Sequence, residues 1–158
     1  MRSPFVPLAL FCAAALSVQA ADLKLKRVWP EWYSADSFQS FYEYHTGREL
    51  TGRGMTVLRS IPGKRAGLYF MTRIENPGAP QTGATLVLRV ISPESTDTRV
   101  FTFPASIPSG SWLFQVGLTG KDWAGPHIQP VAWEIEVHGA DGGLLAKKSS
   151  FLWEKPGP

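Results

Sequence analysis

Residues 131–143 read Val-Ala-Trp-Glu-Ile-Glu-Val-His-Gly-Ala-Asp-Gly-Gly, and this stretch decides the fold class. From Val131 to Val137 every second residue is apolar, a period of two that predicts a strand with those residues in the core. The intervening alanine, two glutamates and His138 are then expected to face water. Gly139 to Gly143 can supply positive φ angles for a tight turn, and Leu144 to Trp153 is expected to return as the partner strand. The stretch therefore predicts a β-hairpin.

The returning segment carries an irregularity. Its apolar positions change parity, because Leu145 shares a face with Phe151 and Trp153 only if Lys147 also faces inward. A β-bulge near Lys147 to Ser149 would reset the register.

Turn residues recur along the rest of the chain and separate further apolar runs. Proline and glycine punctuate it about every ten residues, a spacing typical of an all-β sandwich or barrel. Alternating or short apolar runs mark the expected strands: Leu23/Leu25, Val57, Leu68/Phe70/Ile74, Leu86/Leu88/Val90, Phe101/Phe103 and Trp112/Phe114/Val116/Leu118. With the hairpin this gives about eight strands, which predicts a two-sheet sandwich.

One segment has helical spacing instead. Phe38, Phe41, Tyr42 and His45 fall on one helical face, and Gly47 can end a helix. Asp36 and Gln39 resemble a capping box. We expect one short helix over about residues 36–46, lying across the sandwich or covering one of its ends.

The N-terminus has the order of a cleavable export signal. Arg2 precedes an apolar run from Phe5 to Leu16, and Val18 and Ala20 fit the small positions before a cut. Residues 1–20 are thus expected to be removed, leaving 21–158 as a single domain with no transmembrane segment. The apolar run is about a dozen residues, whereas a membrane-spanning helix needs roughly 20.

The cysteine count indicates the compartment. Cys12 is the only cysteine, and it leaves with the signal, so the mature domain has no disulfide. The chain also has no glycosylation sequon, since Asn76 is followed by Pro77. Both features favour a bacterial periplasmic or secreted protein.

Charge excludes one class of partner. The mature domain has 15 basic and 13 acidic residues, a net charge of +2 that is too even for a nucleic-acid binder. Six basic residues concentrate before the midpoint: Arg48, Arg53, Arg59, Lys64, Arg65 and Arg73. Such a run usually serves solubility, and the alternative is an anionic partner such as a surface polysaccharide or lipid headgroup.

From Gly67 to Trp153 the chain resembles the immunoglobulin-like and fibronectin-type modules of exported bacterial proteins. The resemblance is carried by Asn76-Pro77-Gly78 after one strand, Trp112-Leu113-Phe114 in another, and the Ala132 to Val137 hairpin closed by Asp141-Gly142. The Cys and Trp spacing of true immunoglobulin domains is absent. The resemblance implies an immunoglobulin-like sandwich with a role in binding or as a structural module, and it assigns no functional residues.

Catalytic and cofactor signatures are absent from the sequence. His45, His127 and His138 are widely separated, which argues against a metal site, and no phosphate loop or nucleophile motif occurs. Glu134 and Glu136 would share a strand face roughly 7 Å apart, but on the solvent side rather than in a cleft. We therefore predict no catalytic residue, no metal and no cofactor.

The aromatic residues are the candidates for ligand binding. Trp29, Trp32, Tyr33, Tyr44 and Trp123 fall in expected loops or around the expected helix. They could stack on sugar rings or hold a protein partner. Alternatively, they cap an open end of the sandwich and belong to its core.

These observations lead to an exported, non-enzymatic interaction or structural module whose ligand, an unknown protein or polysaccharide, is bound by loops. The alternatives are a carbohydrate-binding sandwich using Trp32, Tyr44 and Trp123, a small hydrolase centred on Glu134, Glu136 or His127, and a protease inhibitor presenting Lys121 to Pro126.

Overall fold

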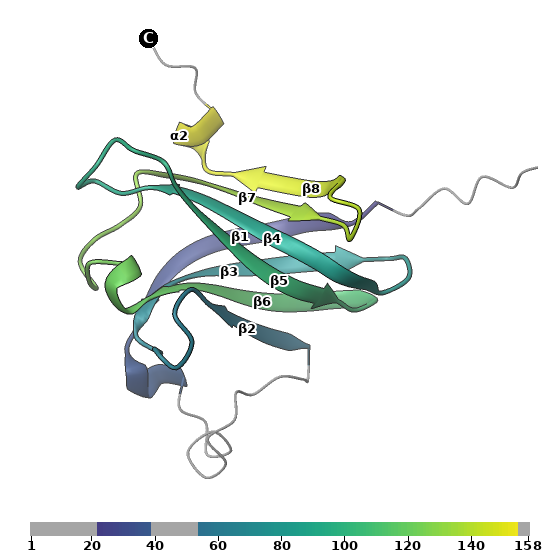
Figure 1. Cartoon of the computed structure of the whole chain (residues 1–158), viewed down its shortest axis with the longest axis horizontal. Coiled ribbons are helices and arrows are strands. Elements are labelled where there is room, and N and C mark those ends of the chain that lie inside the picture. The colour runs from purple at the N-terminus through teal and green to yellow at the C-terminus, as the bar shows by residue number, and fades with distance from the viewer. Residues whose placement is uncertain (1–21, 39–53, 155–158) are drawn as a thin grey trace, which may run out of the picture.

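Two four-stranded sheets face one another in the computed structural model, which describes residues 22–38 and 54–154 (Figure 1). The described elements are, in chain order, β1 (Lys24–Tyr33), η1 (Ala35–Phe38), β2 (Met55–Arg59), β3 (Gly67–Asn76), β4 (Gln81–Ile91), β5 (Arg99–Ile107), β6 (Gly110–Thr119), η2 (Gly120–Asp122), β7 (Ala132–His138), β8 (Leu144–Ser149) and α2 (Phe151–Glu154). The predicted all-β, two-sheet sandwich is confirmed.

In each sheet, some neighbouring strands are not consecutive in the chain. Sheet A has the order β1-β3-β6-β2, and sheet B has the order β5-β4-β7-β8. The chain crosses from sheet A to sheet B between β3 and β4, and again between β6 and β7. Neighbours pair antiparallel, except that β2 runs parallel to β6. Each crossing strand thus pairs with the equivalent strand of the other crossing.

The main core lies between the sheets. Most of its fully buried side chains come from the predicted alternating positions of four strands: Leu68, Phe70, Ile74, Leu86, Leu88, Val90, Phe114, Val116, Leu118, Ile135 and Val137. Phe70 and Trp133 bridge the two sheets with an edge-to-face contact, their ring centroids 5.9 Å apart. The sequence pattern therefore predicted the inner face of these strands.

A second apolar cluster covers the outer face of sheet A. Val57, Tyr69 and Met71 are buried there, with Trp29 and Tyr33 packed against them. Strand β3 is consequently buried on both faces over Leu68–Thr72. Alternation alone predicted only its inner face.

The hairpin is confirmed, with two corrections. Val131 precedes β7 and is 44% exposed, whereas Glu134, expected in water, is buried. The bulge lies at Leu145 and not near Lys147 to Ser149, because His138 pairs with Leu144 and Val137 with Ala146.

The parity change that suggested the bulge has another cause. Strand β8 ends at Ser149, and Phe151 and Trp153 belong to the short helix α2 at the C-terminal end. The expected helix over residues 36–46 lies mostly outside the described residues. Its described beginning, up to Phe38, forms the 3₁₀ helix η1 and not an α-helix.

The sandwich has two distinct ends (Figure 1). We call the end where β1, β2 and β6 finish and β3 begins the loop end, because η1, the β2–β3 loop and η2 gather there. We call the opposite end, which carries the β7–β8 turn, the hairpin end. No helix among the described residues is long and apolar enough to cross a membrane.

Candidate functional site

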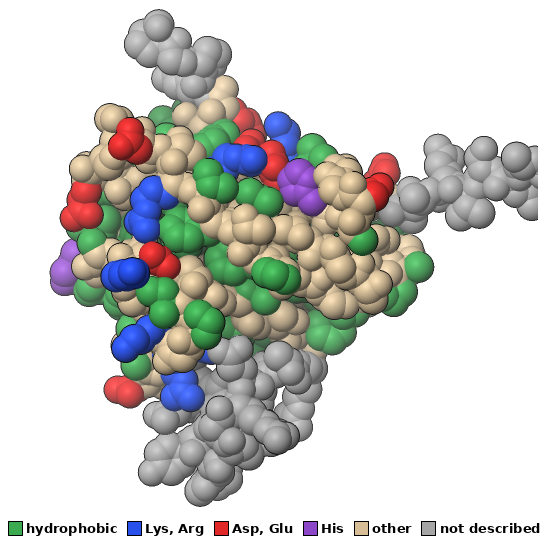
Figure 2. All heavy atoms as spheres, in the orientation of Figure 1, with side chains coloured by type: hydrophobic (Ala, Val, Ile, Leu, Met, Phe, Trp, Pro, Cys, Tyr) green, Lys and Arg blue, Asp and Glu red, His purple; other side chains and the backbone are tan. Residues whose placement is uncertain are grey.

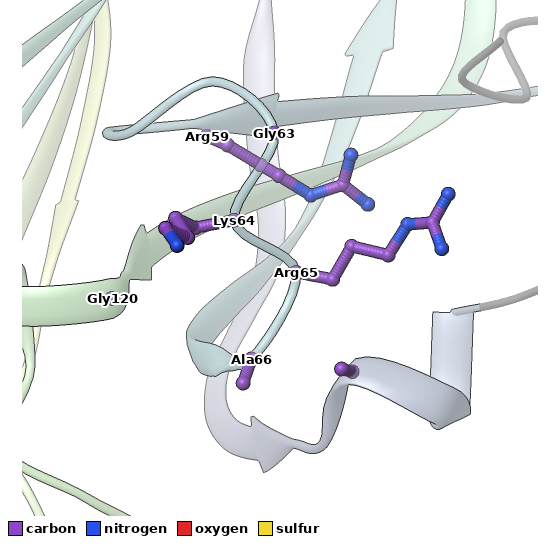
Figure 3. Close-up of a pocket in the computed structure, with 7 residues that line it drawn as sticks. Arg59, Gly63, Lys64, Arg65, Ala66 and Gly120 are labelled. Carbon is purple, nitrogen blue, oxygen red and sulfur yellow. The ribbon is translucent and has the colours of Figure 1, made fainter. Parts of the chain in front are cut away.

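A hollow of about 480 Å³ opens at the loop end. Three separate segments line it: η1, the end of β2 with the loop that follows, and the start of η2. The lining residues are Ala35, Arg59, Gly63, Lys64, Arg65, Ala66 and Gly120 (Figure 3). Three of these side chains are cationic, and none of the described lining residues is acidic.

Tyr69 fixes the two arginines of the hollow. Its hydroxyl accepts a hydrogen bond from Arg59 Nε at 2.8 Å and donates one to the Arg65 carbonyl oxygen at 2.6 Å. The Tyr69 side chain is fully buried, and Tyr33 packs edge-on against its ring. A rigid phenol thus holds the end of β2 and the start of β3 in a set spacing.

The other side of the loop is tied to β6. Ile61 donates its backbone N–H to Thr119 Oγ1 at 3.1 Å, and the same hydroxyl donates to the Ile61 carbonyl oxygen. Ser60 Oγ accepts the Thr119 backbone N–H at 2.9 Å. Because Thr119 is fully buried, its side of these bonds is shielded from water, and together the bonds hold the loop in place.

Two glycines shape the wall of the hollow. Gly63 (φ +78°) and Gly120 (φ +57°) adopt left-handed backbone conformations that favour glycine. A Cβ on Gly120 would lie 3.3 Å from Lys64 Cγ. The lysine stem therefore packs closely over the start of η2.

The cations of the hollow point in two directions. Figure 3 shows the Arg59 and Arg65 guanidinium groups directed to the same side, while the Lys64 side chain turns toward Gly120. Asp122, close to Gly120 in sequence, is paired elsewhere, with Arg99 at 3.6 Å. Positive charge is therefore concentrated on one side of the hollow.

The outer face of sheet B carries a second charged group, which we call the Arg89 network: Arg89, Glu134, Glu136, His138 and Lys147. Arg89 Nη1 lies 3.3 Å from Glu134 and 2.9 Å from Glu136. His138 Nε2 lies 2.8 Å from Glu136, and Lys147 lies 3.8 Å from Glu134. Register explains the grouping, because Arg89 is opposite Glu134, and Lys147 is opposite Glu136.

This network holds Glu136 in its charged form. The hydrogen bond from Arg89, reinforced by His138, keeps the pKa of Glu136 below its usual range, although burial opposes the shift. The hydrogen bond to Glu136 and the contact with the Gly142 carbonyl oxygen raise the pKa of His138. A general acid needs the opposite shift, a raised carboxyl pKa. The lowered pKa therefore does not suit Glu136 to the role of a general acid.

The aromatic candidates lie in different places from those expected. Trp29, Trp32 and Tyr33 belong to strand β1 rather than to a loop, which corrects the sequence interpretation. Trp32 packs on the main core, and Trp29 and Tyr33 on the outer cluster of sheet A. Arg27 stacks on Trp29, 4.7 Å from its ring centroid.

Trp123 is a core residue at the loop end. It is 4% exposed, and its indole N–H donates to the Ile128 carbonyl oxygen at 2.9 Å. A sugar could stack on this ring only if the surrounding structure opened. Tyr44 lies outside the described residues.

Metal ligation finds no support in the described part of the chain. Over residues 22–38 and 54–154, no group of three or more His, Cys, Asp or Glu side chains is arranged to hold a metal ion. His138 instead bridges Glu136 and the β7–β8 turn.

The hollow itself was not predicted. Arg59, Lys64 and Arg65 stand out in the sequence only as members of a basic run. The signal that could have located it is Ile61-Pro-Gly-Lys-Arg-Ala66, a turn sequence that carries two adjacent cations. Its contacts with Tyr69 and Thr119 required the fold.

Comparison with known proteins gives a distant structural likeness. No family model matches the chain, and no curated protein sequence does. A solved structure described as an immunoglobulin-like protein from Pseudomonas aeruginosa aligns with 83% of this chain and 96% of its own, at 17% identity and a TM-score of 0.37. Function must therefore be argued from this chain's own residues.

Proposed function

We propose that this protein is an exported, non-enzymatic interaction module of the immunoglobulin-like class that binds its partner at the loop end. The carrying observation is the hollow lined by Arg59, Lys64 and Arg65, on a loop fixed from both sides by buried side chains. Recognition surfaces are commonly built from loops on a rigid sandwich. A loop fixed before binding loses less conformational freedom when the partner arrives.

Strand order supports the immunoglobulin-like class. The order β5-β4-β7-β8 in sheet B corresponds to the C′-C-F-G sheet of such domains, and β1-β3-β6 corresponds to A-B-E. Strand β2 departs from this scheme, because it occupies the D position while preceding the B strand in the chain and pairs parallel with β6. This departure places Arg59 at the loop end.

Export is supported by the sequence of residues 1–20. The test is the N-terminal residue of the protein recovered from the periplasm or medium of an expressing bacterium, which is expected to be Ala21. A protein retained in the cytosol with an intact Met1 would contradict it.

Site-specific photocrosslinking tests the binding surface in exporting cells. A benzophenone amino acid at Ala35, an exposed residue that lines the hollow, is expected to yield a discrete adduct. The same group at Ser109, exposed at the hairpin end, is the matched control and is expected to yield none. Equal adduct yields at the two positions, or none at either, would overturn the proposal.

A further inference from the structure

We infer that strand β5 is a docking edge at which two copies of this protein pair through their main chains. β5 (Arg99–Ile107) forms one border of sheet B, and β4 is its neighbour among the described strands (Figure 1). A border strand presents a row of unpaired N–H and C=O groups that a strand of another chain can complete. This edge is separate from the hollow at the loop end.

Hydrogen bonds elsewhere in sheet B establish the direction of its backbone groups. The Ser150 N–H donates to the Trp133 carbonyl oxygen at 2.9 Å, so the backbone groups of Trp133 face β8. Successive residues of a strand direct these groups to opposite neighbours, so those of Glu134 face β4, where Glu134 pairs with Arg89. Arg89 therefore faces β7, and the adjacent Leu88 faces β5.

The same alternation continues into β5. Leu88 pairs with Phe101, so the backbone groups of Phe101 are used within the sheet. Val100 and Thr102, on either side of Phe101, consequently direct their N–H and C=O groups away from sheet B. Pro104 occupies the next outward position, where its missing N–H breaks no bond within the sheet.

β5 also lacks the exposed charges that the other long border strands carry. β1 has Lys24 and Lys26 at exposed positions, and β8 has Lys147, whose side chain is 58% exposed. Such charges discourage pairing between edges. Arg99 is the one charged residue of β5, and it is engaged within the chain, since its Nη1 donates to the Asp122 carbonyl oxygen at 2.8 Å. An approaching strand therefore meets no unpaired charge on β5.

A second copy is the occupant that fits, because the segment Arg99–Phe103 is its own complement. Antiparallel pairing about a two-fold axis at Phe101 places Val100 opposite Thr102 of the second copy. Both residues direct an N–H and a C=O outward, so every outward N–H of the segment meets a C=O of the other copy. Pro104 follows the segment and ends this ladder, because it has no N–H to donate.

The side chains of the segment add apolar contact. Val100 is 56% exposed, which makes it one of the most exposed large hydrophobic residues of the described chain. Phe101 is partly buried against the main core, and the Arg99 guanidinium lies 4.9 Å from its ring centroid. The two-fold axis places the two Phe101 rings beside one another as a cross-strand aromatic pair. Pairing thus removes apolar surface from water as well as completing the backbone hydrogen bonds.

Sedimentation velocity of the mature protein from about 10 µM to about 1 mM tests this inference. We expect a reversible monomer–dimer equilibrium within this range, since the contact is short. Val100→Lys places a charge on the paired segment and is expected to weaken dimerisation at least tenfold. Ser106→Lys adds the same charge at an exposed position of β5 beyond Pro104, and it should change dimerisation less than twofold.

A second pair of variants tests the main-chain bonds. Thr102→Pro removes an outward N–H within the segment, and Ser106→Pro removes one outside it. Neither N–H points toward β4, so both variants should keep the fold, which thermal melts verify. We expect at least a tenfold loss of dimerisation for Thr102→Pro and less than a twofold change for Ser106→Pro.

The inference is overturned if the wild-type protein remains a monomer at about 1 mM, even where a benzophenone amino acid at Thr102 crosslinks to a different protein. It is also overturned if the two lysine variants weaken dimerisation equally, or if Thr102→Pro leaves the dimer intact.

Discussion

The Arg89 network and the hollow at the loop end place cationic side chains in opposite circumstances. On sheet B, Arg89 is shared by Glu134 and Glu136, and their side chains are 11% and 14% exposed. In the hollow, the described lining residues contribute three cations and no carboxylate. The first set of charges is neutralised within the fold, whereas the described residues that line the hollow bring no acidic side chain to the second.

This difference in surroundings suggests different roles for the two sets of charges, one in folding stability and the other in binding. Charges paired at low exposure contribute to folding, because removing one partner leaves the other poorly solvated. Of the three cations in the hollow, Lys64 is exposed and is expected to cost little stability when replaced. Figure 2 shows basic side chains at several places on the face it presents, and their number alone does not tell which of them are paired within the fold. The neighbours of each cation decide this.

The most damaging change that we expect is at Gly117, which lies beneath the ring that shapes the hollow. A Cβ there would lie 2.4 Å from Tyr69 Cε1, so Gly117→Ala must displace a fully buried ring. Overpacking of this kind costs about 3 kcal/mol. Urea unfolding measures it, with Ser111→Ala, exposed on the same strand, as the control. A loss below about 1 kcal/mol would mean that the ring moves freely.

Arg89→Ala tests the closed charge network. It leaves Glu134 and Glu136 without their shared guanidinium, and we expect a loss of about 2 kcal/mol in the free energy of unfolding, because the pair is only partly buried. Adding Glu134→Gln and Glu136→Gln should recover part of the loss by removing the unpaired charges. Lys24→Ala is the exposed control, expected within about 0.5 kcal/mol of wild type. Equal effects of Arg89→Ala and Lys24→Ala would break the comparison.

The sequence pattern predicted the inner faces of the strands better than their outer faces. In β7 a polar residue follows each of Trp133, Ile135 and Val137, and in β4 buried and partly exposed positions alternate from Ala84 to Ile91, so a period of two is visible. In β1 it is not, because a register shift follows Leu25 and Pro30 interrupts the run. Proline is tolerated here because β1 is an edge strand. Trp29 and Tyr33 were therefore mistaken for loop residues.

The hollow depends on contacts that no local pattern contains. Arg59 reaches it because β2 runs parallel to β6, and Thr119 bonds to Ile61 across 58 residues of sequence. Gly120 lies beside Lys64 only after that pairing forms. The sequence could name the basic residues but could not place them around one cavity.

Tyr69→Phe tests the rigidity of the hollow. The variant keeps the buried ring but removes the hydroxyl that bonds Arg59 Nε and the Arg65 carbonyl oxygen. We expect a stability loss of about 1 kcal/mol and faster amide exchange in residues 60–66. Thr72→Val, buried on the same strand, also deletes a hydroxyl and is the control for exchange. Unchanged exchange in Tyr69→Phe would show that the loop does not need this clamp.

The smallest effect should be a pH dependence confined to the closed network. Both ring nitrogens of His138 face acceptors, Nε2 the Glu136 carboxylate and Nδ1 the Gly142 carbonyl oxygen, so only the imidazolium donates to both. Its pKa is raised above the ordinary 6.5, chiefly by the hydrogen bond to Glu136. This contribution is therefore full below about pH 6.5 and is lost as the pH rises through the folded-state pKa. The Glu136 pKa is lowered, so its contribution is present above pH 4.5 and is lost on acidification through the folded-state value.

Unfolding of wild type and His138→Gln at pH 5.5 and pH 8.5 isolates the histidine. We expect wild type to lose some tenths of a kcal/mol more than the variant over this interval, since a histidine pair that is still partly exposed to water is worth less than about 1 kcal/mol. His127→Gln, exposed in the segment between η2 and β7, is the matched control and should keep the wild-type slope. If His127→Gln also removes the slope, or if the slope survives in His138→Gln, the histidine does not belong to the closed network. Its contact with Glu136 would then contribute nothing to the contrast between the two charged regions.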